Sequence, residues 1–109
     1  MSDVLTEAQM QASIIETARD FGWLCFHAHD SRRSEPGYPD LTLVRPPRLL
    51  FIEVKTADGR LSKGHWNKGR TRWLPGQDTW RDALVQCPGV EYYLCRPSNL
   101  ADVYAALIT

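Results

Sequence analysis

Three charged residues occupy positions where the hydrophobic pattern predicts β-strands. Asp40 opens the run DLTLV, and Glu53 and Lys55 lie two positions apart near the end of the run LLFIEVK. Because side chains alternate along a strand, Glu53 and Lys55 share one face with Phe51, and the other face is apolar. Carboxylate oxygens are the ligands that hard divalent cations prefer in proteins. These residue types and this spacing therefore indicate a metal site.

The two acids come together if the two runs form a β-hairpin. A turn centred on the bond between Pro46 and Pro47 places Asp40 opposite Glu53. Opposed side chains lie about 4.5–5.5 Å apart at Cβ, close enough for two carboxylates to share one cation. Without a cation or a proton the two carboxylates would repel each other. Pro-Pro does not suit the favoured tight turns, however, and a bulge or a longer loop would shift this register.

The alternative to a metal site is a solvated strand edge. A Glu and a Lys that alternate on a strand most often form a surface ion pair. The residues before Glu53 are LLFI, which is too apolar for an exposed edge and favours a buried site. Glu7 adds a third acid on the inner face of the first predicted helix. Its alternative role is that of a helix-start acid stabilised by the helix dipole, and both interpretations stay open.

The elements that would position these acids follow from the sequence pattern. The capping box Thr6-x-x-Gln9 and the glycine Gly22 predict a helix over residues 7–21. One face of this helix carries Met10, Ile14, Ala18 and Phe21, and Glu16 projects opposite. We expect strands over residues 23–28, 40–44, 49–55 and 90–95, and helices over residues 78–86 and 99–107, the last capped by Ser98. The predicted order is α-β-β-β-α-β-α.

Length and composition exclude several classes of protein. The chain has 109 residues, 43% of them hydrophobic, which predicts a single domain over residues 1–109 with its own core. No apolar run reaches the roughly 18–20 residues of a membrane helix, and the N-terminus lacks signal-peptide features, so we expect a cytosolic protein. The three cysteines contain no C-x-x-C pair, which favours buried thiols over a disulfide scaffold or a thiolate zinc site.

The charge is unevenly distributed along the chain. A net charge of zero argues against nucleic acid as a partner, yet residues 59–77 hold five Lys or Arg and no acid. The segment 60–76 reads as a basic loop insertion whose cations and aromatics would neutralise phosphates and stack on unpaired bases. The alternative is a solvated insertion whose Trp side chains fold back onto the core. The candidate DNA-binding residues are Arg32, Arg33, Lys63, His65, Trp66, Lys68, Arg70 and Arg72.

Two histidines alternate at the end of the first predicted strand. His27 and His29 could be mistaken for zinc ligands. A zinc site needs further ligands, and no third one lies at a fitting spacing. We therefore expect a core or substrate-side pair at these positions.

Two strings of residues carry a family resemblance. Gly37-Tyr38-Pro39-Asp40-Leu41, followed by Phe51-Ile52-Glu53-Val54-Lys55, resembles the signature of the PD-(D/E)XK nucleases and in particular of the small VRR-Nuc family. The likeness extends from about residue 6 to residue 104. One departure is that residues 63–76 separate the Leu-Ser pair from the Gln-x-x-Trp helix. The other agreeing features are Glu7-x-x-x-Gln11, Gly22-Trp23, Ser31-Arg32-Arg33-Ser34, Gly59-Arg60-Leu61-Ser62 and Gln77-x-x-Trp80.

The resemblance implies a fold and an activity. The fold would be an α/β restriction-endonuclease-like core with a central mixed sheet flanked by helices, and the activity a Mg²⁺- or Mn²⁺-dependent DNA endonuclease. Asp40, Glu53 and the Val54 carbonyl correspond to the metal ligands of the family. Lys55 would hold or activate the attacking water.

The resemblance also suggests roles for residues on two helices. Gln77 would orient that water or Lys55, and Glu7 would support a second metal, or the first one through water. Trp80, three residues from Gln77, is predicted to pack in the core.

Stand-alone proteins of this size resemble junction-resolving enzymes of phages and bacteria, which act as homodimers. We therefore expect branched or Holliday-junction DNA as substrate, a homodimer, and the bacterial host cytoplasm if the chain is phage-encoded. The alternatives are a nicking or flap nuclease without junction preference, and a catalytically inactive DNA-binding module. The presence of Asp40, Glu53 and Lys55 favours an enzyme, because a pure binder gains nothing from acids that face phosphate.

Overall fold

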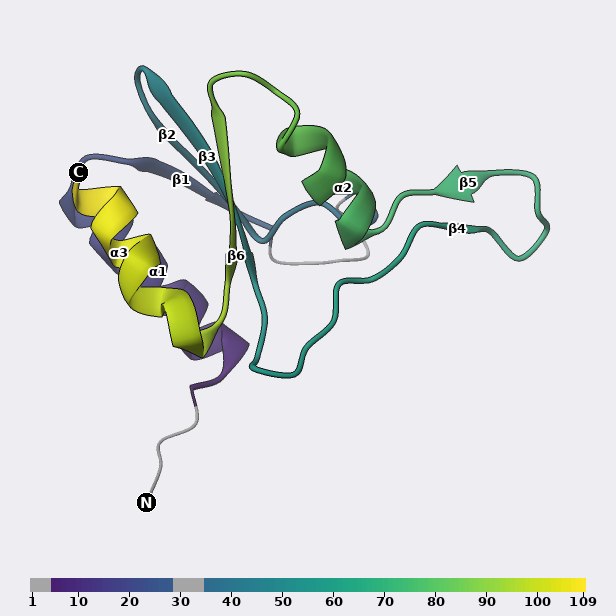
Figure 1. Cartoon of the computed structure of the whole chain (residues 1–109), viewed down its shortest axis with the longest axis horizontal. Helices are drawn as coiled ribbons and strands as arrows, with labels where there is room; N and C mark the ends of the chain where they lie inside the picture. The colour runs from purple at the N-terminus through teal and green to yellow at the C-terminus, as the bar shows by residue number, and fades with distance from the viewer. Residues whose placement is uncertain (1–4, 29–34) are drawn as a thin grey trace.

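A computed structural model of the chain describes residues 5–28 and 35–109. Its central feature is a four-stranded sheet, to which a separate two-stranded hairpin and three helices are added (Figure 1). In chain order the elements are α1 (Glu7–Asp20), β1 (Leu24–His27), β2 (Leu41–Arg45), β3 (Arg48–Val54), β4 (His65–Trp66), β5 (Trp73–Leu74), α2 (Gln77–Leu84), β6 (Val90–Cys95), the 3-10 turn η1 (Pro97–Asn99) and α3 (Leu100–Ile108).

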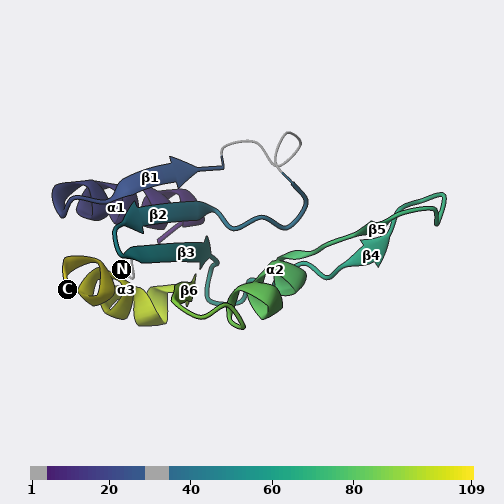
Figure 2. The same cartoon turned by 90° about the horizontal axis from the view of Figure 1, so that it is seen from above.

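The sheet has the strand order β1-β2-β3-β6. β1, β2 and β3 are antiparallel neighbours, and β6 runs parallel to β3. Helices α1 and α3 cover one face of the sheet, and α2 lies on the other (Figures 1 and 2). The predicted α/β fold with a central mixed sheet flanked by helices is therefore confirmed.

The core lies between the sheet and the pair α1 and α3. The predicted stripe of α1 is confirmed for Met10, Ile14 and Ala18, which are fully buried. The prediction that Phe21 belongs to this stripe is wrong. The helix ends at Asp20, and Phe21, which is its C-cap, is 47% exposed. The apolar residues that share this core are Trp23, Leu41, Leu43, Leu50, Ile52, Val54, Cys95, Val103 and Leu107.

The turn between β2 and β3 keeps the predicted register. Arg45 pairs with Arg48 and Leu41 with Ile52, so no bulge shifts the hairpin. The bond between Pro46 and Pro47 is cis, the arrangement found in type VI turns, which close a connection of two residues. Beyond the last pair, Asp40 and Glu53 are the next opposed positions, as the sequence predicts.

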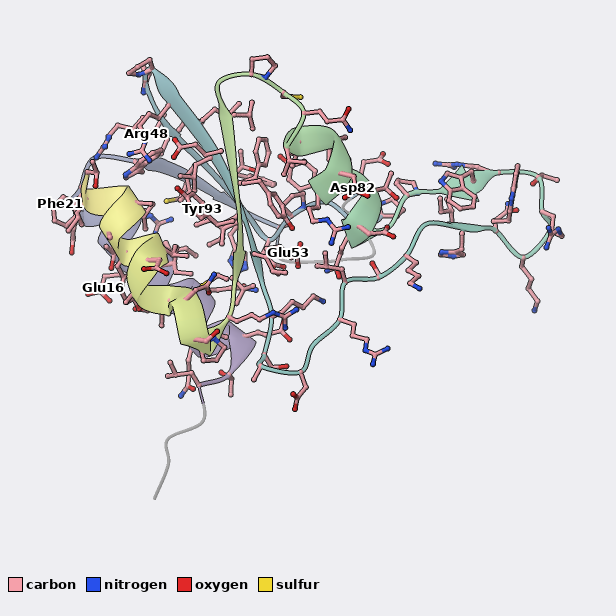
Figure 3. The ribbon with its side chains drawn as sticks, in the orientation of Figure 1. Glu16, Phe21, Arg48, Glu53, Asp82 and Tyr93 are labelled. Atoms are coloured by element: carbon pink, nitrogen blue, oxygen red, sulfur yellow. The ribbon has the colours of Figure 1, made fainter. Side chains whose placement is uncertain are left out.

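An arginine cluster closes the turn end of this hairpin (Figure 3). The guanidinium carbons of Arg45 and Arg48 lie 4.5 and 4.9 Å from the ring centre of Trp23. Arg48 also donates to both carboxylate oxygens of Glu91, at 2.8 and 2.7 Å, and to the Ala106 carbonyl at 2.9 Å. Arg45 and the Trp23 indole donate to the carbonyl of residue 107. The cluster therefore anchors the end of α3 to the sheet.

Several predicted boundaries and exposures need correction. The segment 60–76, predicted to be a loop, contains the hairpin of β4 and β5. Ser98 does not cap the last helix, because η1 leads directly into α3 with Asn99 as the N-cap. Cys87, expected to be buried, is exposed beyond the end of α2, whereas Cys95 is buried.

Candidate functional site

Asp40 and Glu53 lie together at the open end of the β2–β3 hairpin. The Asp40 carbonyl accepts a hydrogen bond from the amide of Ala28, which fixes the entry into β2 beside β1. Its carboxylate accepts from the Val54 amide at 2.8 Å. Glu53 is only 2% exposed, although the residues before it on β3 are apolar and offer it no polar partner. The strand pairing therefore buries one carboxyl group directly beside another.

The surroundings of Glu53 strongly favour its protonated form. Burial is the main cause, the charge of Asp40 and a hydrogen bond with Asp40 add to it, and together they raise the pKa of Glu53 to about 9. The positive charge of Lys55 acts in the opposite direction but does not compensate. At neutral pH the pair therefore carries one proton, in the position where a cation would otherwise neutralise it.

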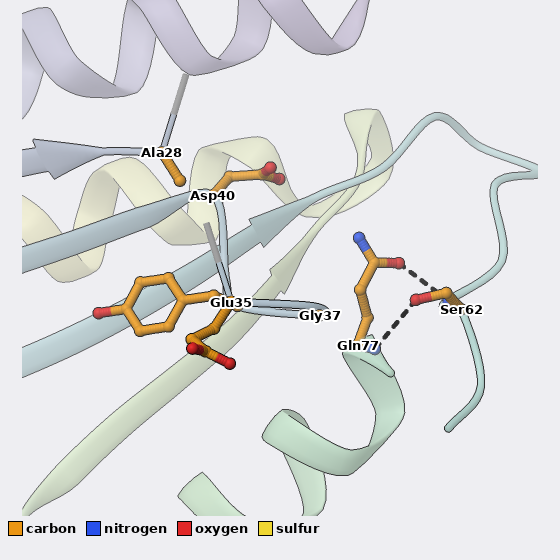
Figure 4. A pocket seen from close by; sticks show the side chains of 7 residues that line it. Ala28, Glu35, Gly37, Asp40, Ser62 and Gln77 are labelled. Atoms are coloured by element: carbon orange, nitrogen blue, oxygen red, sulfur yellow. Dashed lines mark hydrogen bonds between the residues drawn. The ribbon is translucent and has the colours of Figure 1, made fainter. Parts of the chain in front are cut away.

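Gln77, the first residue of α2, connects this pair to the loop after β3. Its side-chain amide donates to Glu53 Oε1 at 2.8 Å, and its side-chain carbonyl accepts from the Ser62 amide at 2.9 Å. The Ser62 hydroxyl in turn accepts from the Gln77 backbone amide at 3.0 Å (Figure 4). Both ends of the Gln77 side chain are therefore fixed, and Glu53 accepts one defined hydrogen bond.

Two glycines let three backbone segments meet at this point. A Cβ atom on Gly37 would lie 2.3 Å from the carbonyl carbon of Gly76, and one on Gly76 would lie 2.3 Å from that of Lys63. Gly37 also has φ +80°, a conformation that other residues rarely adopt. Only glycine at both positions allows the loop before Asp40 to pack against the start of α2, where Gln77 begins.

Lys55 follows Glu53 on the same face of β3 and is half-buried. Its side-chain stem lies against Gly59, where an added Cβ would be 3.3 Å from Lys55 Cδ. Arg96 holds this turn in place by donating to the carbonyls of Thr56 and Gly59, each at 2.7 Å. The ammonium group is therefore kept near the acid pair by the turn that follows the strand.

Glu7 and Tyr92 lie near the pair without a hydrogen bond to it. The charge of half-buried Glu7, on the first turn of α1, contributes slightly to the raised pKa of Glu53. Burial, together with the charge of Glu53, raises the pKa of Tyr92 to about 12. The buried hydroxyl of Tyr92 finds no hydrogen-bond partner among the described residues. Glu7 therefore adds to the negative potential at Glu53, whereas Tyr92 responds to the charge of Glu53.

A cleft of about 210 Å³ opens onto Asp40 and Gln77 (Figure 4). It lies between the loop before β2, the segment after β3 and the start of α2. The residues that line it are Ala28, Glu35, Gly37, Tyr38, Asp40, Ser62 and Gln77. The acid pair is therefore accessible from solvent on the Asp40 side and closed on the Glu53 side.

The donor set fits a hard divalent cation with few protein ligands. No group of three or more His, Cys, Asp or Glu side chains within residues 5–28 and 35–109 is arranged to hold an ion. Asp40 and Glu53 supply two carboxylates. The Val54 amide points at Asp40, and its carbonyl points to the same side, since both groups of one strand residue do. Mg²⁺ often binds through one or two carboxylates, with waters and phosphate oxygens completing its octahedron.

The candidate DNA-binding residues fall on the hairpin and just before it. Lys63, His65, Lys68, Arg70 and Arg72 are all exposed. Trp66 is 48% exposed, so the alternative in which the hairpin's tryptophans fold back onto the core is wrong. The hairpin projects away from the sheet on the side of α2 (Figure 2).

The remaining sequence predictions concern the two histidines, Arg32, Arg33 and Trp80. Arg32, Arg33 and His29 lie outside the described residues. His27 is half-buried on β1. The prediction that Trp80 packs in the core is confirmed only in part, because Trp80 is half-buried and lies outside the core cluster. Its ring packs edge-on against Tyr38 with centroids 5.0 Å apart, and its indole donates to the Pro36 carbonyl.

Three residues of the site were not predicted from the sequence. Ser62 enters the sequence analysis only as part of a motif, because its hydrogen bonds to Gln77 join positions 15 residues apart and no local pattern indicates them. Arg96 and Tyr92 carry no signal, because their roles depend on β6 lying parallel to β3. The parallel pairing joins segments that are far apart in the sequence.

Comparisons with protein-family models, curated proteins and solved structures give no match for this chain. The site must therefore be interpreted from its chemistry. Its defining features are a buried carboxyl group beside a half-buried one, a nearby ammonium group, a side-chain amide fixed by hydrogen bonds and a projecting basic hairpin.

Proposed function

We propose that this protein is a Mg²⁺- or Mn²⁺-dependent endodeoxyribonuclease that hydrolyses phosphodiester bonds in DNA. The observation that carries the proposal is the Asp40–Glu53 pair, in which buried Glu53 lies beside half-buried Asp40, which lines a cleft. A structural role does not account for it, since burying one acid beside another destabilises a fold. The family resemblance of the motif around the pair supports the same activity.

The pair and the Val54 carbonyl would hold the metal ion. When bound there, the ion supplies Lewis-acid chemistry, polarising the scissile phosphate and lowering the pKa of a water. The Val54 amide holds one carboxylate oxygen of Asp40, and Asp40 lines the cleft. Gln77 holds Glu53 in place through its amide and leaves the second Glu53 oxygen for the ion.

Lys55 acts on the substrate side of the pair. Its ammonium group offsets phosphate charge and donates a hydrogen bond that holds the attacking water. The turn tethered by Arg96 keeps the lysine in reach. Glu7, whose charge influences Glu53, would support a second ion or the first through water.

The partner is a DNA backbone that runs from the cleft toward the hairpin. Lys63, Lys68, Arg70 and Arg72 are exposed cations that would contact phosphates. Arg32 and Arg33, outside the described residues, are proposed for the same role from the sequence alone. Branched or Holliday-junction DNA is our leading substrate, and a homodimer would supply two sites for two strands. A nicking or flap nuclease, and an inactive DNA-binding module, are the alternatives.

A cleavage assay separates these functions. Wild-type protein is incubated with Mg²⁺ or Mn²⁺ and with labelled linear, flap and four-way DNA, alongside Asp40→Asn, Glu53→Gln and Lys55→Met. The exposed acid Glu16, on the outer side of α1, provides the control Glu16→Gln (Figure 3). We expect the three site variants to lose cleavage and the control to retain it.

Each outcome selects one function. Paired, symmetrical cuts in four-way DNA select the junction resolvase, and equal cutting of flap and linear DNA selects the less selective nuclease. DNA binding without any cleavage selects the inactive module and rejects the proposal.

A further inference from the structure

We propose that the hairpin of residues 65–74 reads unpaired bases. In this proposal Trp66 and Trp73 stack on single-stranded nucleotides of the DNA, next to the bond that the acid site cleaves. The position of the cut rests on the function proposed above. Recognition of unpaired bases does not, because it can be measured without cleavage.

The two tryptophans form one aromatic surface. Trp66 and Trp73 are directly opposed in the β4–β5 pairing, so both side chains project from the same face. The next pair, Asn67 with Arg72, is hydrogen-bonded at 2.8 Å. Hydrogen-bonded and non-hydrogen-bonded pairs alternate in an antiparallel ladder, so the tryptophans form a non-hydrogen-bonded pair, in which the side chains lie closest together. Their ring centroids are 5.8 Å apart, at 80° to each other. The pair therefore supports itself without help from the core.

This aromatic surface stays open to solvent. Trp66 and Trp73 are 48% and 50% exposed, and the hairpin extends beyond the body of the protein (Figure 1). Exposing large apolar rings to water is unfavourable in free energy, so two adjacent exposed tryptophans indicate a contact surface.

The charge around the pair specifies an anionic partner. Residues 59–77 contain five Lys or Arg and no acid. None of these cations is in an ion pair within the part of the chain that the structure describes. Aromatic rings that alternate with unpaired cations fit a strand of nucleotides, because bases stack on the rings while phosphates meet the cations. Duplex DNA offers the phosphates but keeps its base faces covered.

The hairpin presents these groups in a fixed arrangement. The Asn67 side-chain carbonyl accepts from the amides of Thr71 and Arg72, at 2.8 and 3.2 Å, which locks the tip. At the base, the Gly64 amide donates to Asp78 Oδ1 at 3.1 Å. Gly64 also leaves room for the Trp73 ring, which would be 2.6 Å from a Cβ there. Such preorganisation lowers the entropy lost on binding.

The length of the chain places the aromatic pair near the cut. Ser62 and Gln77 line the cleft, and each is four residues from the nearer tryptophan. Four extended residues span at most about 14 Å. At about 3.4 Å per base along one strand, this distance equals about four nucleotides. The bases read by the hairpin therefore lie within about four nucleotides of the cleaved bond.

Binding without divalent ions tests the aromatic pair. We would measure fluorescence anisotropy with a labelled oligodeoxythymidine and with a duplex of the same length, in EDTA. The double variant Trp66→Ala, Trp73→Ala should weaken single-strand binding about 10-fold to 100-fold and duplex binding less than about twofold. The double variant Trp66→Phe, Trp73→Phe should keep most of the wild-type affinity for the single strand. Leu24→Ala, at another exposed apolar residue, is the matched control.

The cations should behave differently from the rings. Replacing Lys68, Arg70 and Arg72 with Ala should weaken both complexes and reduce the slope of log affinity against log salt by about 2. Equal loss of single-strand and duplex binding in the double tryptophan variant would overturn the proposal. So would a change in that variant's sedimentation mass, which would place the pair between two copies of the chain.

Abasic sites test the position. Placed one at a time along an unpaired tract, they should slow wild-type cleavage only within about four nucleotides of the cut, and should not slow the double tryptophan variant further. The two proposals fail separately. If single-strand binding depends on the tryptophans but the protein cleaves no DNA, the proposed nuclease activity is rejected. If the protein cleaves DNA but its single-strand binding does not depend on the tryptophans, the proposed reading of unpaired bases is rejected.

Discussion

The β2–β3 hairpin pairs two basic residues at one end and two acidic residues at the other. At the turn, Arg45 is paired with Arg48, and at the open end Asp40 is opposite Glu53. The arginines are compensated by the Trp23 ring, by main-chain carbonyls and by the Glu91 carboxylate. The carboxyl groups receive hydrogen bonds from the Val54 amide and Gln77 and the charge of Lys55, which do not prevent the raised pKa of Glu53. The protein compensates the charges at the turn end of the hairpin but not those at the open end.

The difference separates stability from function. A like-charged pair that the fold itself compensates contributes to the packing of α3 and needs no ligand. A like-charged pair that the fold leaves uncompensated lowers stability and is explained by a ligand of opposite charge. Variants at the two ends should therefore change different measurements.

The largest effect is expected on catalysis at the acid end. Asp40→Asn or Glu53→Gln should lower the cleavage rate by about 1000-fold, because each removes a proposed metal ligand. The double variant should be little worse than either single one, since the two acids act as a unit. Single-turnover cleavage, normalised by the folded fraction from circular dichroism, measures both effects. Independent, multiplicative losses would contradict a shared ion.

The stability of the metal-free protein should fall as the pH rises. Glu53 has a pKa of about 9 when folded and near 4.5 when unfolded, so the folded state binds more protons between these values. The stabilising contribution is complete below about pH 4.5 and is lost as the pH rises through 9. From pH 6 to pH 8 we expect a loss of about 1–3 kcal/mol, by urea denaturation in EDTA. Glu53→Gln should lack this loss, and a parallel decline in both proteins would assign it to other groups.

At the turn end, stability rather than catalysis should change. Arg48→Met removes the bonds to Glu91 and Ala106 and the contact with Trp23, and should cost about 2 kcal/mol, or roughly 10 °C in Tm. Cleavage per folded molecule should stay the same. Differential scanning calorimetry and the cleavage assay test the two halves of this prediction. A large loss of specific activity would show that the two ends are coupled.

The smallest effect is expected at the residue that supports the acid pair. Gln77→Ala should reduce cleavage about 10-fold, because it removes the hydrogen bond that holds Glu53 without removing a ligand. The matched control is Gln86→Ala, beyond the other end of α2, where the side chain bonds only to its own turn. The metal concentration for half-maximal rate should rise in the first variant and not in the second.

The sequence predicts the hairpin and its acids well because both depend on local patterns. Alternating apolar residues define β2 and β3, and two prolines leave only a short turn between them, so the opposition of Asp40 and Glu53 follows from counting. The predicted boundaries of α1, β3 and β6 are close to the observed ones for the same reason. The family assignment and the activity stay predictions.

The features that could not be predicted depend on contacts between distant segments. β4 and β5 are two residues long each, too short for a detectable alternation. The hydrogen bond from Gln77 to Glu53 requires Gly37 and Gly76 to meet, and no local pattern indicates that contact. Phe21 was placed in the core because helical periodicity does not reveal where a helix stops.

The close approach of Gly76 to Lys63 and Gly64 brings the two ends of the hairpin segment together, and we call this segment, residues 63–76, a cassette. The chain leaves the body of the protein after Ser62 and returns to the same place before Gln77, so the two residues remain hydrogen-bonded as if nothing intervened. An insertion with adjoining ends adds a function without disturbing its host. The cassette could thus be shortened to a tight turn, or exchanged for another, while Asp40, Glu53 and Gln77 keep their positions.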